Sequence, residues 1–175
     1  GSYRLFNSEF AQYIRGDIDF RYYNLLDENN SLVYRFFAGA GLPYGNSTAL
    51  PFEKKYFAGG ANGIRAWQVR NLGPGSYEET EVSAFPNKTA DIKLEANFEY
   101  RFKLFWVLEG ALFLDAGNIW AINTDDERQG ALFKFDKFYK DIAVGTGLGT
   151  RFVFSFFTFR FDLGMKVRDP AIQLG

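Results

Sequence analysis

Apolar and polar residues alternate with a period of two along most of the chain. The clearest run covers residues 91–102, where one parity is apolar and the other is charged or carries an amide. The apolar set is Ile92, Leu94, Ala96, Phe98, Tyr100 and Phe102, and the polar set is Asp91, Lys93, Glu95, Asn97, Glu99 and Arg101. Successive side chains of a β-strand point to opposite faces, so this run predicts a strand with one apolar and one polar face.

The same alternation recurs in six segments of about 13 to 15 residues. The predicted strands lie near residues 9–23, 31–44, 90–102, 104–118, 141–153 and 155–168. Short turns at 24–30, near 103 and at 154–156 alternate with two long loops at 45–89 and 119–140. Soluble strands average roughly five or six residues, whereas a tilted membrane-spanning strand needs about nine to eleven. Outer-membrane barrels combine short periplasmic turns with long extracellular loops, which matches this order of connections.

We therefore predict an all-β fold, an antiparallel up-and-down transmembrane β-barrel with loops 45–89 and 119–140 on the extracellular side. The alternative is a soluble, lipocalin-like barrel with its apolar face inward, because periodicity alone does not say which face meets lipid. The polar face carries charged residues on nearly every strand, and the two signs are interleaved. Such a face suits a hydrated lumen with internal ion pairs, which favours the membrane barrel.

Composition removes several classes of function. Lys and Arg total 20 against 21 Asp and Glu, a formal net charge of −1, so no basic field is available for nucleic acid. The chain has no Cys and no His, which excludes thiolate sites, most zinc sites and a histidine base. The phospholipase and protease barrels of outer membranes depend on a histidine. We therefore expect no metal, no cofactor and no enzymatic activity.

The chain is expected to be part of a longer protein. No signal peptide is evident, and Gly1-Ser2 has the form of a cloning remnant. Six strands are also too few to close around a charged lumen, because small closed barrels start near eight strands. We therefore expect the free strand edges of the isolated segment to pair with another copy or a partner chain.

Loop 45–89 is too long for a simple connection, since loops beyond about 12 to 15 residues are usually functional or disordered. Residues 56–67 read Tyr-Phe-Ala-Gly-Gly-Ala-Asn-Gly-Ile-Arg-Ala-Trp. A phosphate-binding glycine loop would need a strand–loop–helix context and a following Lys-Ser/Thr, and neither is present. A freely solvated loop is the other interpretation, but Ile64, Trp67 and Val69 suit water poorly. A loop folded into a polar lumen accommodates both these apolar residues and Arg65.

Two motifs then resemble one known family. The loop segment resembles the sixth-extracellular-loop signature of the BamA/TamA superfamily, usually written (V/I)-R-G-(F/Y), and its residues are Gly59, Gly60, Ile64, Arg65, Ala66 and Trp67. Two strands later, Phe113-Leu114-Asp115-Ala116-Gly117 resembles the F-x-D-x-G motif of the same family. The chain departs from the family where Ala66 replaces Gly and Trp67 replaces Phe or Tyr. Alanine at that position implies that a positive φ is not required there.

The resemblance implies specific roles for these residues. Arg65 would be held in the lumen by Glu95 and Asp115, both on the polar parity, and would lock the loop across the barrel. Phe113 and Gly117 would belong to the motif strand beside this lock. A bidentate Arg–carboxylate contact is stronger than a surface pair, and lysine does not reproduce its geometry.

The resemblance also implies a protein and a location. The chain would be the C-terminal part of a 16-stranded barrel, with 9–23 as its tenth strand and 155–168 as its fifteenth, preceded by periplasmic POTRA domains. It would lie in the outer membrane of a diderm bacterium and assemble, insert or translocate other proteins. Its partners would be outer-membrane lipid, unfolded β-barrel clients, the POTRA domains and accessory assembly proteins. A two-partner secretion transporter barrel and a diffusion porin remain as alternatives.

Overall fold

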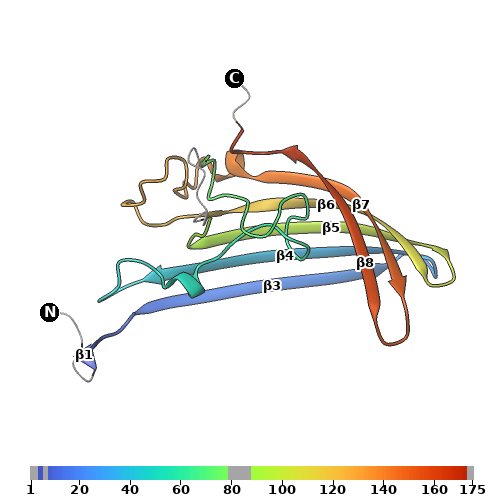
Figure 1. The fold of residues 1–175 in the computed structure, drawn as a ribbon, viewed down its shortest axis with the longest axis horizontal. Helices are drawn as coiled ribbons and strands as arrows, with labels where there is room; N and C mark the ends of the chain where they lie inside the picture. The colour runs from blue at the N-terminus through green and yellow to red at the C-terminus, as the bar shows by residue number, and fades with distance from the viewer. Residues whose placement is uncertain (1–3, 6–7, 79–87, 173–175) are drawn as a thin grey trace.

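The computed structural model describes residues 4–5, 8–78 and 88–172, and its main element is a six-stranded antiparallel sheet (Figure 1). The strands follow one another in sequence order: β3 (Tyr13–Leu25), β4 (Asn30–Pro43), β5 (Ile92–Phe105), β6 (Leu108–Trp120), β7 (Ala143–Val153) and β8 (Thr158–Arg168). The sheet twists so that β8 runs obliquely across the direction of β3 (Figure 1). β3 and β8 each have one neighbour, so this is an open segment of an up-and-down barrel wall.

Four shorter elements accompany the sheet. β1 (Arg4–Leu5) and β2 (Ser8–Glu9) form a separate two-stranded ladder that the sequence pattern did not predict. Two 3-10 turns lie in the long loops, η1 (Phe52–Lys54) and η2 (Phe138–Asp141). Among the described residues, no helix is both long and apolar enough to cross a bilayer.

The turn between β5 and β6 lies later than the sequence pattern placed it. β5 continues to Phe105, and the connection is made at Trp106 and Val107 rather than near Lys103. Trp106 has a φ of 48°, which places it in the turn and not on a strand face. The run from Leu104 to Leu108 is entirely apolar and contains no turn-forming residue. The pairing of the two strands, and not the local sequence, therefore decides where the chain reverses.

The apolar parity of the strands forms the outer face of the sheet. Cross-strand partners share a face, and the register pairs Phe20 with Phe36 and Leu114 with Phe98, so the apolar side chains make one continuous surface. Most of this surface is uncovered; Ile14 and Leu163, near its two ends, are 68% and 72% exposed. An apolar face left outside is the reverse of a lipocalin-like arrangement and is typical of a membrane barrel.

The buried core lies on the other face, between the sheet and the β4–β5 loop. It is a cluster of eight residues, Tyr56, Ala58, Ile64, Trp67, Leu72, Ala90, Ile119 and Ala143. Six of them belong to the loop itself, so the loop folds back on the polar face and supplies most of the core. In Figure 1 this loop is the teal-to-green trace that crosses the strands.

Candidate functional site

The β4–β5 loop is held on the polar face by short pieces of backbone pairing. Tyr56 and Ala90 form an antiparallel bridge, and Ala58 and Leu72 form another further along. Between them the chain turns at Gly59 and Gly60, whose φ angles are 92° and 91°. A Cβ atom at Gly59 would lie 2.2 Å from the carbonyl oxygen of Gln68, so the turn needs a residue without a side chain.

The two apolar residues of the loop motif are buried as anchors. Ile64 is fully buried and Trp67 nearly so, both within the core cluster. The ammonium group of Lys166 on β8 lies 5.1 Å from the centre of the Trp67 ring system, a cation–π contact from the barrel wall. These contacts explain why apolar side chains can occur in this loop, because they are removed from water by the sheet.

Arg65 projects from the loop between these anchors and binds Asp115 on β6. Its Nε and Nη2 atoms each lie 2.9 Å from a different oxygen of that carboxylate, and its backbone N–H donates to the same group at 3.0 Å. The guanidinium carbon also stacks over the ring of Phe113 at 3.6 Å. The two charged side chains are 7% and 0% exposed, so this is a buried, bidentate ion pair.

The second carboxylate at Arg65 is Glu99, which lies four residues along β5 from Glu95, the residue that the sequence suggested. Nη1 of Arg65 donates to Oε2 of Glu99. The same oxygen accepts from Arg151 on β7 at 2.9 Å, and Arg101 donates to the other oxygen at 2.6 Å. Asp162 on β8 completes the network, 2.8 Å from Arg151 and 3.8 Å from Arg65. Charges therefore alternate in sign from the loop to the last strand of the sheet.

Glu95 was expected beside Arg65, but it holds a different part of the loop. Its Oε2 atom accepts from Arg35 on β4 at 3.3 Å, and Lys93 lies 2.9 Å from Oε1. A Cβ atom at Gly63 would lie 2.8 Å from Oε1, so Glu95 packs directly under the loop backbone. Asn97, between the two carboxylates, donates to the carbonyl of Gly63 at 2.8 Å. Glu95 and Glu99 thus support two nearby residues of the same loop, Gly63 and Arg65.

Glycines on the inner face leave room for this arrangement. Ala66, which is not among the residues with positive φ, lies against Gly145 of β7 and Gly164 of β8. A Cβ atom at Gly145 would lie 2.7 Å from Cβ of Ala66, and one at Gly164 would lie 2.9 Å from its Cα. The motif residue Gly117, with a φ of 152°, faces the backbone of Leu94, whose oxygen a Cβ there would approach to 2.2 Å.

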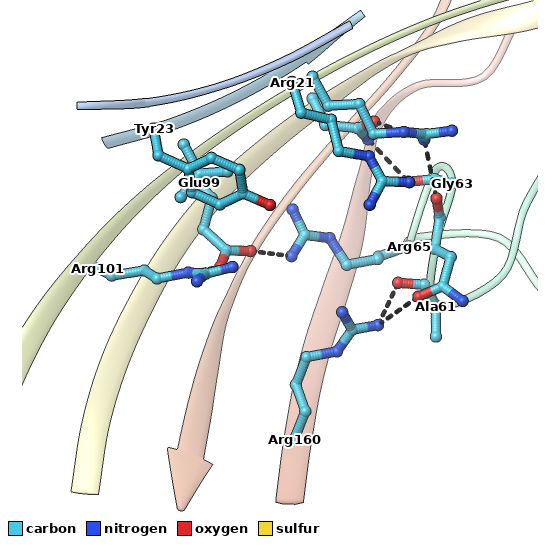
Figure 2. A pocket seen from close by; sticks show the side chains of 12 residues that line it. Arg21, Tyr23, Ala61, Gly63, Arg65, Glu99, Arg101 and Arg160 are labelled. Carbon is cyan, nitrogen blue, oxygen red and sulfur yellow. Dashed lines mark hydrogen bonds and ion pairs between the residues drawn. The ribbon is translucent and has the colours of Figure 1, made fainter. Parts of the chain in front are cut away.

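Beside the network lies a cavity of about 310 Å³, shown in Figure 2. Five guanidinium groups line it, those of Arg21, Arg35, Arg65, Arg101 and Arg160. Two of them are tied to the loop backbone from opposite sides: Arg35 donates to the carbonyl of Asn62 at 2.9 Å, and Arg160 donates to that of Ala61. Arg35 of β4 and Arg160 of β8 therefore both bind the tip of the loop.

This arrangement is suited to holding a loop. Its members are paired guanidinium and carboxylate groups, amides and aromatic rings, with no nucleophile beside a base. Within the described ranges, no group of three or more acidic, Cys or His side chains is placed to hold a metal ion.

Sequence reasoning missed several contributors to the site, among them Glu99, Arg151, Asp162, Gly145 and Gly164. Alternation did place the charged residues among them on the polar face, but as many as six polar residues share that face on a single strand, β5. Nothing in the sequence gives the position of Arg65 along the barrel axis, that is, its height in the lumen.

The long strands have an apolar outer face, and the β4–β5 loop is ion-paired to the inner wall. These features define a segment of a transmembrane β-barrel whose lumen holds its own loop. Residues 1–173 match the Omp85 superfamily domain, and the chain belongs to that superfamily. This confirms the resemblance found in the two motifs.

The chain is similar to two individual proteins. It is 31% identical over 87 residues to the outer membrane protein assembly factor BamA of Neisseria meningitidis serogroup B (strain ATCC BAA-335 / MC58), which covers 48% of this chain and 11% of that protein. It is also similar to the crystal structure of BamA from Haemophilus ducreyi lacking POTRA domains 1-3, with a TM-score of 0.67 and 13% identity. That match covers 90% of this chain and 32% of the other, and at this identity it shows the fold alone.

Proposed function

We propose that the chain is a barrel segment of an outer-membrane factor that assembles or inserts other β-barrel proteins, and that Arg65 locks the β4–β5 loop across its lumen. The observation that carries this proposal is the buried bidentate contact of Arg65 with Asp115. The name of the Neisseria relative, an outer membrane protein assembly factor, supports the assembly role. We place the parent protein in the outer membrane of a diderm bacterium, with POTRA domains and accessory proteins on its periplasmic side.

The lock has a physical rationale. Removing one partner of a fully buried ion pair leaves the other charge uncompensated, at about 3–5 kcal/mol. Arg65 and Asp115 are both buried, and the network reaches β7 and β8 through Arg151 and Asp162. The loop position is therefore tied to the spacing of four wall strands, β5 to β8. A loop held this way occupies the lumen, which argues against a simple diffusion porin.

The two free edges of the sheet need partners in a bilayer. β3 and β8 each present one unpaired edge, and an unsatisfied backbone group costs several kcal/mol in hydrocarbon. In the parent protein we assign these edges to the remaining barrel strands. In the isolated segment we expect them to pair with a second copy.

Substitution of Arg65 in the full-length parent tests the proposal. Arg65→Ala should leave the barrel inserted but reduce the assembly of β-barrel clients, measured as folded client in cells depleted of the wild-type protein. Arg70→Ala is the matched control, because Arg70 lies in the same loop and its guanidinium stacks near the rings of Phe52 and Phe57, with no ion pair among the described residues. Equal client assembly by both variants would contradict the lock. A defect confined to export of a single soluble partner would instead favour a two-partner secretion transporter.

A further inference from the structure

The β6–β7 loop folds onto the outer, apolar side of the sheet. Trp120, at the end of β6, is the register partner of Ile92 and therefore shares its outward face. Although it lies on that face, Trp120 is fully buried. Phe133 and Phe138 from the loop pack edge-on against it, with ring centres 5.7 and 6.3 Å away. The loop thus extends the apolar wall at its long-loop end, where it appears in gold in Figure 1.

The aromatic cluster continues from Trp120 into the exterior. Phe135 contacts both Phe133 and Phe138, and Tyr139 contacts Phe138. Phe135 is 85% exposed and Tyr139 is 54% exposed. Aromatic side chains with one apolar and one wet end are characteristic of the interface between hydrocarbon and head groups.

Lysines are interleaved with these aromatic residues. Lys134, Lys137 and Lys140 are all exposed. In the part of the chain that the structure describes, no carboxylate oxygen lies within 4 Å of their ammonium groups. The segment also contains Asp136 and Asp141. Burial raises the pKa of Asp141, whose carboxylate accepts from the indole N–H of Trp120 at 3.4 Å and also interacts electrostatically with Lys134 and Arg168.

β8 contributes a third part of the same surface. Arg168, its last residue, donates to the backbone carbonyls of Tyr139 and Lys140 and so fixes η2 to the strand. A cavity of about 480 Å³ lies beside this contact. Its lining combines cations with apolar residues and one carboxylate: Lys140, Lys166, Arg168, Val167, Ile172 and Asp169. Val167 and Ile172 are exposed, so the cavity opens next to the lipid-facing wall.

We propose that residues 131–141 and Arg168 bind the phosphate-bearing head group of an anionic lipid in the leaflet at the long-loop end of the barrel. Unpaired lysines at the head-group level attract lipid phosphate, while Phe135, Tyr139 and the Val167–Ile172 cavity accept the acyl region. A soluble anion would use the lysines but gain nothing from the exposed rings. An acidic protein partner fits less well, because it would have to approach a surface that adjoins hydrocarbon. This inference rests on the outer-membrane placement proposed above.

The test uses the full-length parent in neutral detergent and lipid A, a glycolipid with two phosphates, as a fluorescent probe. Lys137→Gln combined with Lys140→Gln should weaken lipid A binding by about 30-fold, the factor expected for two lysines near an anionic lipid surface. The matched control is Lys54→Gln with Lys103→Gln, which removes the same charge from exposed positions elsewhere. Phe135→Ser, at an exposed position, should weaken binding of lipid A but not of inorganic phosphate.

The outcomes separate the possible explanations. Equal weakening in the two double variants would show non-specific charge attraction and overturn the site, as would an unchanged affinity in all variants. Displacement of the probe by inorganic phosphate at concentrations similar to those of unlabelled lipid A would show a site for free anions and overturn the lipid assignment. Failure of the wild-type parent to insert into bilayers would contradict the outer-membrane proposal itself. Normal insertion with unchanged lipid A affinity would contradict this site alone.

Discussion

Arg65 and Asp115 meet through three hydrogen bonds although 50 residues separate them in the chain. Two of these bonds come from the guanidinium group and one from the backbone N–H of Arg65. The contact therefore fixes both the side chain and the main chain of the loop at one point on the wall of β6. Most of the predictions below follow from this geometry.

The first prediction is energetic coupling between the two residues. In the full-length parent, Arg65→Ala and Asp115→Asn should each expose the loop to protease, and the double variant should be little worse than either alone. The loss should approach about 3–5 kcal/mol if burial is complete and be smaller if water enters the lumen. Rates of loop cleavage in the four proteins give the coupling free energy. Additive effects would contradict the lock.

The second prediction separates Glu99 from Glu95. Glu99 contacts Arg65, whereas Glu95 contacts Arg35 and Lys93. A double-mutant cycle of Arg65→Ala with Glu99→Gln should show coupling of about 1 kcal/mol or more, because the two side chains share a hydrogen bond. The same cycle with Glu95→Gln should be close to additive. Coupling to Glu95 in place of Glu99 would show that the loop sits at a different height in the lumen.

The third prediction is that lysine does not replace Arg65. A lysine ammonium is a point charge and cannot form the planar, two-point contact with Asp115 or stack flat over Phe113. Arg65→Lys should therefore lose most of the loop protection that Arg65→Ala loses. If Arg65→Lys keeps wild-type protection and client assembly, charge alone holds the loop, and the bidentate geometry is unimportant.

The fourth prediction concerns the space under Ala66. Gly164→Ala places a methyl group about 3 Å from three backbone atoms of Arg65 and Ala66 without altering any charge. Such overpacking costs about 1–3 kcal/mol and should displace the loop. Gly16→Ala is the control, because a Cβ atom there has no neighbour within 4 Å. The readout is again loop cleavage, and equal behaviour of the two variants would exclude a close fit at Gly164.

The fifth prediction uses Trp106 to locate the other membrane boundary. Trp106 lies in the β5–β6 turn and is 84% exposed, whereas Trp67 and Trp120 are buried. In vesicles that contain brominated lipids, quenching of tryptophan fluorescence should arise mainly from Trp106. Trp106→Phe should therefore remove most of the fluorescence that the brominated lipids quench, and leave the emission of the buried Trp67 and Trp120. Equal quenching in wild type and variant would place this turn in water, away from the bilayer.

Much of the fold could be predicted from local sequence. Alternation defines the two faces of a strand through the geometry of consecutive residues, so the six long strands and their polar and apolar sides were recognisable before any pairing was known. Where alternation gave no signal, the prediction was wrong, as at the turn placed near Lys103 and found at Trp106 and Val107. The ladder of β1 and β2 was missed because two-residue strands are too short to show a period.

The composition of the site was decided by tertiary structure. The sequence alone determined that Arg65 belongs to a family-like loop and that Asp115, Glu95 and Glu99 share the polar face. It did not determine which carboxylate meets Arg65, because that depends on the strand register and on the path of the loop between two bridges. Nor could it assign Gly145 and Gly164 to Ala66, since the contact joins three separate elements. Parity is a local property of a strand, whereas height in a barrel is set by pairings between residues far apart in the chain.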